Sequence, residues 1–255
     1  MTKTISPVEI CKNHTGKMEG IQSISTAVTL NPFCQEQQKV KDSICSHCFA
    51  EAMMKMYDAL DAKLARNTEL LTTKVLDESE LPDTTGQKIF RFESFGDLNN
   101  ETQLINYLNI AKHNPDTRFT LWTKRYKRVH DYFATHDVPE NFTLILSSMM
   151  VNVKMPLTFM KKLGKFKPGQ LKSFTVYDKD YIMEHWAEMN LTCGSRFCMG
   201  CRLCYDKNEV EEISEVLKKD QPEVDRYLEC HDPAKIAANR AILEEVDSLF
   251  SDLEL

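Results

Sequence analysis

The sequence lacks several features that would assign it to a familiar class. It has no run of about 18 apolar residues, so no transmembrane helix is expected. Residues 1–11 lack the basic and then apolar layout of a signal peptide, which favours a cytoplasmic protein. The chain has neither a glycine-rich phosphate-binding loop nor a Gly-x-Ser-x-Gly nucleophile elbow. No internal repeat or low-complexity linker divides its 255 residues, a length that suits a single barrel-like α/β domain.

Cysteine, in contrast, is abundant, with nine residues in the chain. Seven of them form two tight groups. Because a reducing compartment discourages structural disulfides, clustered cysteines in a cytoplasmic protein are better explained as metal ligands. Cys11 and Cys230 stand alone, and we expect them to act as small apolar residues.

Short apolar runs alternate with helical patterns along most of the chain. Strands are expected at 21–30, 88–92, 118–122, 142–146 and 173–177, and helices at 101–113, 126–135, 156–164 and 179–189. Successive strands are separated by the length of one strand–helix unit. Five such units predict an α/β fold whose mostly parallel sheet forms a partial (β/α) barrel, with ligands at the carboxyl ends of the strands.

The pattern also divides the chain. Pro32 ends the first strand, and a cysteine-bearing loop follows. A helix is then expected with one apolar face, made of Phe49, Met53, Met56, Leu60 and Leu64. We expect a partial barrel with the first metal site at 1–190, a cysteine-rich metal-binding loop at 191–207 and an acidic helical tail at 208–255. The last part of that tail, 236–253, is amphipathic.

The net charge of −6 hides an uneven distribution. The stretch 124–172 holds ten basic residues against three acidic ones, and 209–255 holds 14 acidic residues against five basic ones. Both are explained by solvated helix faces. The basic stretch 124–172 is also suited to an anionic ligand or to nucleic acid, and we keep nucleic acid as a candidate partner.

The first cysteine group is Cys34, Cys45 and Cys48. The two residues between Cys45 and Cys48 let both thiolates bind one metal centre. A structural zinc takes four ligands, whereas a [4Fe–4S] cluster held by three cysteines leaves one iron open for chemistry. A zinc site completed by His47 or Cys11 stays open as the alternative.

The second group places four thiols within twelve residues: Cys193, Cys198, Cys201 and Cys204. Gly194 and Gly200 allow the tight turns that wrapping a small centre requires. The short gaps resemble those of ferredoxins and favour an auxiliary [4Fe–4S] cluster, while tetrahedral sulfur ligands suit zinc as well. A single cluster shared between the two groups is a third arrangement that the spacing allows.

Three cysteines after the first strand, with His47 just before the last of them, resemble the cluster loop of radical S-adenosylmethionine enzymes. After the second strand, Ser94-Phe95-Gly96-Asp97 is similar to the turn that receives the methionine amino group in that family. The resemblance implies a [4Fe–4S] cluster on the first group and S-adenosylmethionine at His47, Gly96 and Asp97. An ordinary turn with a helix cap explains Asp97 equally well. Ser147 ends the fourth strand and is a candidate to hydrogen-bond a ribose or carboxylate.

More specifically, the chain resembles the phage gene-product-eighty-eight family over roughly residues 20–205. The matching motifs are Asn31-Pro32-Phe33-Cys34, Cys45-Ser46-His47-Cys48-Phe49-Ala50-Glu51, Arg91 to Asp97, and Leu121-Trp122-Thr123-Lys124. The resemblance implies an iron–sulfur protein of the host cytoplasm. We therefore expect an enzyme that cleaves S-adenosylmethionine reductively to act on an unknown substrate. The alternative is a non-enzymatic protein, stabilised by iron–sulfur or zinc, that binds nucleic acid or a host protein.

Overall fold

The structure is a computed structural model that describes residues 6–194 and 197–231. Within them one sheet runs in chain order: β1 (Cys11–Lys12), β2 (Gln22–Ile24), β3 (Ile89–Phe92), β4 (Arg118–Thr123), β5 (Phe142–Ser147), β6 (Leu171–Tyr177) and β7 (Glu212–Val216). β1 is antiparallel to β2, and each later neighbouring pair is parallel. The sheet is open, with β1 and β7 at its edges. The expected α/β class and mostly parallel sheet are confirmed, and the barrel remains a prediction.

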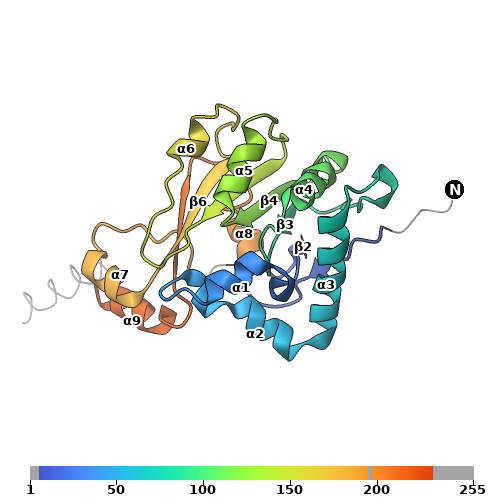
Figure 1. The fold of residues 1–255 in the computed structure, drawn as a ribbon. Coiled ribbons are helices and arrows are strands. Elements are labelled where there is room, and N and C mark those ends of the chain that lie inside the picture. Colours follow the sequence, from blue (N-terminus) through green and yellow to red (C-terminus); the bar gives the residue numbers. More distant parts are fainter. Residues whose placement is uncertain (1–5, 195–196, 232–255) are drawn as a thin grey trace, which may run out of the picture.

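Helices occupy the connections between the parallel strands, and one helix, α9, follows the last strand. They are α1 (Pro32–Gln38), α2 (Phe49–Met56), α3 (Asp58–Thr73), α4 (Glu101–His113), α5 (Tyr126–Phe133), α6 (Thr158–Lys161), α7 (Lys179–His185), α8 (Cys198–Cys201) and α9 (Gln221–His231), with the 3₁₀ helices η1 (Val28–Leu30), η2 (Ile44–His47) and η3 (Glu78–Glu80). Figure 1 shows α4, α5 and α6 along one face of the sheet and α1 and α2 below its strands. In the described part of the chain, no helix has the length and apolar character needed to cross a membrane.

The main core lies between the sheet and these helices. Phe90, Phe119 and Phe142 stand beside one another in the strand register and belong to this core. The ring of Phe92 stacks on Tyr107 of α4, with centroids 4.3 Å apart, and on Phe119 at 5.0 Å. Alternate residues of the same strands point to the opposite face, because side chains alternate along a strand.

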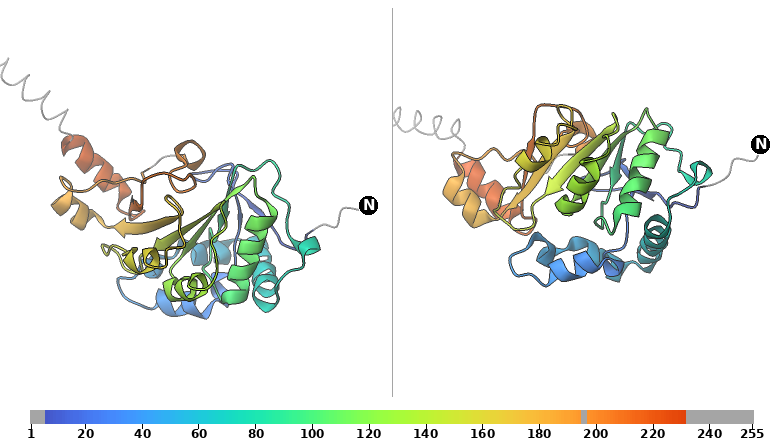
Figure 2. Two further views of the ribbon diagram at one scale, coloured as in Figure 1. Left: turned by 90° about the horizontal axis from the view of Figure 1, so that it is seen from above. Right: turned by 45° about the horizontal axis from the view of Figure 1, so that its top comes forward.

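That opposite face carries a second apolar cluster, made of Ile21, Ile89, Trp122, Ile145 and Ile213. The segment around α8 covers it, with Cys193, Cys198, Met199, Cys204 and Tyr205 packed against the cluster. Figure 2, which views the molecule from above, separates this segment from α4 and α5 by the sheet. The second cysteine group therefore lies on the face of the sheet that the crossover helices leave bare.

Strands β3 to β6 lie within two residues of their expected positions, and α4 coincides with the expected helix 101–113. The expected helices 126–135, 156–164 and 179–189 are shorter in the structure, as α5, α6 and α7. Helix α6 ends three residues before Gly164, whose φ of 64° is not helical and turns the chain out of the helical path.

The strand expected at 21–30 is wrong beyond Ile24. After three residues in β2 the chain enters η1, and Leu30 is 52% exposed, so the apolar alternation does not continue. Cys34 does not lie in a loop, because Pro32 stands at the first position of α1 and the Asn31 side chain accepts a hydrogen bond from the backbone N–H of Phe33. Proline at this position and asparagine at the cap are strong signals that begin a helix.

The helical face expected from Phe49 to Leu64 is confirmed for Leu60 and Leu64, which pack in a core cluster, and is wrong for Phe49 and Met56. The chain forms two helices there, α2 and α3, separated at Tyr57, whose backbone is extended. Phe49 and Met56 are exposed, at 58% and 67%, while Met54 is buried. The break at residue 57 changes the helical phase, so a single stripe across both helices cannot face the core.

The expected helical tail contains a strand that the sequence reading missed. β7 pairs with β6 in parallel along its whole length, with Phe174 opposite Ile213. The glutamates of β7 made this segment look like part of an acidic helix in the sequence. In the structure they lie on the edge strand, where Glu212 forms an ion pair with Lys154 and Glu215 with Lys17. Helix α9 agrees with the expected helical character, and the amphipathic segment 236–253 lies outside the described residues. The division of the chain at 190 and 207 remains a prediction.

A pair of methionines tests the placement of the core. Met160 of α6 is fully buried in the main core, whereas Met56 is 67% exposed. We expect Met160→Ala to lower the free energy of unfolding by about 2–5 kcal/mol, because it leaves a cavity. Met56→Ala should change it by less than about 0.5 kcal/mol. Urea unfolding measures both, and equal effects of the two substitutions would contradict this arrangement.

Candidate metal centres and ligand pocket

The three cysteines of the first group come from three consecutive elements. Cys34 lies in α1, Cys45 in η2, and Cys48 caps the amino end of α2. The Ser43 side chain accepts a hydrogen bond from the backbone N–H of Ser46 and so begins η2. Cys34 is buried, and the other two thiols are half-buried.

This segment is fastened to the carboxyl ends of the strands at two points. The Asn31 side chain donates to the backbone carbonyl of Asp97, after β3, at 2.8 Å. The N–H of Ile44 donates to the carbonyl of Met149, after β5, at 3.0 Å. The cysteine segment therefore lies at the edge of the sheet where ligands bind in parallel α/β folds.

The thiols of the first group interact electrostatically with one another. Burial raises the pKa of Cys34, and the charges of Asp97, Glu93 and Cys45 raise it further. Burial likewise raises the pKa of Cys45, to which Asp97 and Cys48 contribute, while the ammonium of Lys124 lowers the pKa of both thiols. In the absence of metal the structure therefore favours protonated thiols, and a metal ion must displace these protons.

Asp97 is buried and held by the protein itself. Its Oδ1 accepts hydrogen bonds from the Leu98 N–H at 2.7 Å and from the Thr123 hydroxyl. Its Oδ2 accepts from the Lys124 N–H at 2.9 Å. Burial raises the pKa of Asp97, and these donors together with the Lys124 charge oppose the shift. A carboxylate has about four acceptor sites, so one acceptor position remains.

Gly96 is required for close packing. A Cβ atom at this position would lie 2.6 Å from the carbonyl oxygen of Thr26 and 2.7 Å from Oε2 of Glu93. The turn thus fits against the end of β2 only because residue 96 has no side chain. Atoms of Thr26 and Glu93 therefore lie directly against Gly96. A role of Gly96 in binding S-adenosylmethionine stays a prediction.

Glu93 is a buried acid that the sequence reading missed. Its carboxylate accepts hydrogen bonds from the Tyr107 hydroxyl at 2.6 Å, from the Thr26 hydroxyl at 2.8 Å and from the Gln103 amide. Burial raises its pKa to about 7, against the opposing effect of the hydrogen bonds. Its backbone φ is 59°, an uncommon value for a residue other than glycine. The only signal in the sequence is an acid directly after the apolar strand β3.

The remaining residues expected to bind a cofactor are dispersed. His47 is exposed at the end of η2. Ser147 is buried in β5 and points to the same face as Ile145, away from the crossover helices. Within the described residues no three Cys, His, Asp or Glu side chains converge closely enough to form a ready metal site. The cysteines are neighbours and need side-chain movement to ligate one centre.

The second cysteine group surrounds a small cavity of about 20 Å³. All four thiols line it: Cys193, Cys198, Cys201 and Cys204. The segment is fixed by the Cys193 N–H, which donates to the Ser214 carbonyl in β7 at 2.8 Å, and by the Cys198 N–H, which donates to the Lys17 carbonyl at 2.9 Å. The four cysteines predicted to share a site therefore line one cavity, and metal binding there stays a prediction.

Cations surround these thiols. Burial raises the pKa of Cys204 to about 12, and Arg91 and Lys172 counteract this shift. Arg91 and Lys17 act in the same way on Cys198. Lys172 is completely buried, and its ammonium donates to the Leu203 carbonyl at 2.7 Å. Three positive charges thus face a group that becomes strongly negative when its thiols ionise.

The basic stretch 124–172 does not form one continuous surface. Five of its lysines form ion pairs with carboxylates: Lys127 with Asp131, Lys154 with Glu212, Lys161 with Glu211, Lys165 with Asp137 and Lys167 with Glu140. Only the residues from Lys124 to Arg128 gather around a pocket. Much of the charge counted in the sequence is therefore neutralised within the fold, and nucleic acid as a partner stays a prediction.

These features define an α/β protein with a sequential, mostly parallel open sheet and two cysteine groups, one at its carboxyl edge and one on its bare face. The chain belongs to the Gene product 88 family, whose family model matches residues 5–168. The resemblance to this phage family is thus confirmed, although the match ends before 205 and leaves out the second cysteine group. No curated protein and no solved structure matches the chain.

The pKa of Glu93 predicts a pH dependence. Between about pH 4.5 and 7 the folded state retains a proton that the unfolded state has released, so stability falls as pH rises through this window. The loss amounts to up to about 3 kcal/mol. Glu93→Gln cannot ionise and should reduce this slope. Urea unfolding of wild type and variant at pH 5 and pH 8 measures the difference.

The matched control is Glu19→Gln, at an exposed glutamate, which should leave the pH dependence unchanged. If wild type and Glu93→Gln lose the same stability between pH 5 and pH 8, then Glu93 does not titrate in this range.

Proposed function

We propose that this protein is an iron–sulfur enzyme of the radical S-adenosylmethionine type, in which Cys34, Cys45 and Cys48 hold a [4Fe–4S] cluster. The observation that carries the proposal is the gathering of these thiols from three elements at the carboxyl edge of the sheet. The charge of Cys45 raises the pKa of Cys34, and the charge of Cys48 raises the pKa of Cys45. The chain supplies this arrangement in the connection after its first parallel strand.

The donor set fits such a cluster. Thiolates are the usual ligands of iron–sulfur clusters, and three of them leave one iron open. His47, exposed beside Cys48, is the fourth ligand of the alternative, a zinc site. The chemistry that a bound cluster supplies is a single electron for the reductive cleavage of the sulfonium of S-adenosylmethionine.

The chain's own residues shield Cys34, one of the three proposed ligands, from water. Cys34 packs in an apolar cluster with Val28 and Met54, against which Phe33 and Phe95 lie. A surrounding of this kind keeps the dielectric constant low and protects reactive species from solvent. The ammonium of Lys124, which lowers the pKa of Cys34 and Cys45, favours the thiolate form that binds metal.

Asp97 and Ser147 are the residues that we propose for binding S-adenosylmethionine. The one free acceptor position of Asp97, on Oδ2, suits the ammonium of the methionine moiety. Ser147 lies at the carboxyl end of β5, on the face of the sheet away from the helices. Both residues follow or end strands whose carboxyl ends share the edge occupied by the cysteine segment.

For the second cysteine group we propose a structural metal, and the size of its cavity favours a single zinc ion over a cluster of several atoms. A space of about 20 Å³ holds about one water-sized particle. Four thiolates around one ion match the tetrahedral coordination of structural zinc. The charges of Lys17, Arg91 and Lys172 compensate the negative charge of such a site. An auxiliary [4Fe–4S] cluster, the other candidate, would require the segment to open.

A second function is favoured by one observation. Because Gly96 is explained by packing against Thr26 and Glu93, the turn needs no ligand to account for it. A metal-stabilised binding protein without enzymatic activity agrees equally well with this turn. The two functions differ in a single measurable product, 5′-deoxyadenosine.

The cluster proposal predicts that anaerobically purified protein, reduced with dithionite, releases 5′-deoxyadenosine from S-adenosylmethionine. Cys45→Ser should lower the rate at least about 100-fold and remove the iron and sulfide bound at this group, because a cluster is not retained by two thiolates. Product chromatography and metal analysis measure both effects.

Cys230→Ser is the matched control, since Cys230 is exposed in α9 and stands apart from both groups. It should keep full iron content and activity. Release of equal background amounts by wild type and Cys45→Ser, with iron retained in wild type, would support the binding protein instead.

The second site predicts a separate loss. Cys204→Ser should release about one zinc per chain, lower the melting temperature and leave the iron of the first group in place, because metal binding at a structural site contributes directly to folding. Zinc and iron analysis of the same preparation distinguishes the two sites. Joint loss of iron and zinc in properly folded Cys204→Ser would indicate one shared centre.

A further inference from the structure

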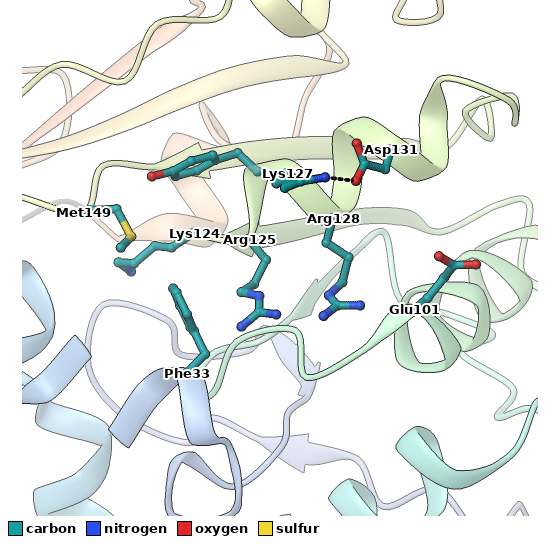
Figure 3. A pocket seen from close by; sticks show the side chains of 9 residues that line it. Phe33, Glu101, Lys124, Arg125, Lys127, Arg128, Asp131 and Met149 are labelled. Atoms are coloured by element: carbon teal, nitrogen blue, oxygen red, sulfur yellow. Dashed lines mark hydrogen bonds and ion pairs between the residues drawn. The ribbon is translucent and has the colours of Figure 1, made fainter. Parts of the chain in front are cut away.

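A pocket of about 410 Å³ opens beside the first cysteine group. Figure 3 shows its walls: Phe33 from α1, Met149 after β5, Glu101 of α4, and the residues from Lys124 to Arg128 that follow β4. The guanidinium groups of Arg125 and Arg128 extend side by side into the same space, with the Lys124 side chain nearby. A volume of this size is typical of small-molecule sites.

The cations of this pocket are only partly balanced by acids, of which Asp97 acts on Lys124 through its charge. Lys127 pairs with Asp131 at 2.6 Å, but Lys124, Arg125 and Arg128 have no carboxylate within 4 Å among the described residues. Glu101 acts on Arg128 through its charge without forming an ion pair. The Nε atom of Arg128 is buried and has no hydrogen-bond partner within the part of the chain that the structure describes.

This arrangement has an electrostatic cost in the absence of a ligand. Burial and the neighbouring charge of Arg125 both lower the pKa of Arg128. Arg125 is held over the ring of Phe33, 4.5 Å from its centroid, which orients its guanidinium. An anion between the two guanidiniums reduces this repulsion and accepts hydrogen bonds from them.

We propose that this pocket binds a nucleotide, with its phosphate between Arg125 and Arg128. Paired guanidiniums match the geometry of a phosphate through bidentate hydrogen bonds, and Lys124 adds a third charge for a dianion. Tyr126 and Met149 provide apolar surface for the remainder of the ligand. The volume accommodates a mononucleotide, whereas a free phosphate ion would leave most of it unfilled.

The inference stands on the pocket alone and requires no metal. Its position nevertheless bears on the chemistry. Lys124 lines the pocket and also acts electrostatically on Cys34 and Cys45, and Phe33 precedes Cys34 in α1. A nucleotide bound here lies next to the first cysteine group, where a substrate of that centre must be.

Calorimetry with the purified full chain tests the proposal, using AMP, GMP, CMP, UMP, adenosine and inorganic phosphate as separate probes. We expect at least one nucleotide to bind at least tenfold more tightly than phosphate, and adenosine not to bind. Arg125→Gln and Arg128→Gln should each weaken nucleotide binding at least tenfold. Arg125→Lys keeps the charge but loses the two-pronged hydrogen bonding, and it should weaken binding less than Arg125→Gln.

The matched control is Arg118→Gln, which removes one positive charge at the opposite end of β4 and should change affinity less than twofold. Far-ultraviolet circular dichroism verifies that each variant is folded. Unchanged nucleotide affinity in folded Arg125→Gln and Arg128→Gln overturns the proposal. So does binding of a single-stranded oligonucleotide with no measurable binding of any mononucleotide, which would assign the pocket to a polymer.

Discussion

Each strand from β2 to β6 pairs with the strand that follows it in the chain, and all of these pairs are parallel. A chain that returns parallel to its own previous strand must cross over the sheet, and the common handedness of such crossovers keeps their helices on one face. Two further features depend on this constraint. The carboxyl ends of all six strands share one edge, where α1 and α2 bring the first cysteines. The opposite face is free of the longer crossover helices α4 and α5, and the segment containing the short helix α8 covers it.

Much of this sheet could be predicted because its strands are strongly apolar and regularly spaced. The interior strands β3 to β6 are buried on both faces, which gives continuous apolar runs in the sequence. The edge strands were harder. β2 is three residues long, and the apolar run that contains it continues into η1. As an edge strand, β7 exposes one side to lysines and solvent, and that side carries glutamates. In the sequence, these glutamates resemble the charge pattern of a surface helix.

The sites divide in a similar way. Both cysteine groups could be picked out from their short spacing. The structure places the four cysteines of the second group around one cavity, while metal binding by either group stays a prediction. Glu93 was not, because its importance arises from Thr26, which follows β2, and from Gln103 and Tyr107 of α4, which the fold brings together. Gly96 was noticed for its expected freedom of backbone, while its actual neighbour is the carbonyl of Thr26. The count of lysines in 124–172 likewise could not show which of them meet carboxylates.

The apolar cluster on the bare face has a consequence for cooperativity. Ile89, Trp122 and Ile145 all belong to the range matched by the family model, but the side chains that cover them come from residues beyond 190. A fragment ending at residue 168 would lack these covering side chains and would expose the cluster as one apolar patch. The strands that carry the cluster also carry the main core on their other side. The range matched by the family model therefore lacks the residues that cover one face of its sheet. We expect the later segment, with its own cysteines, to unfold together with the sheet that it covers.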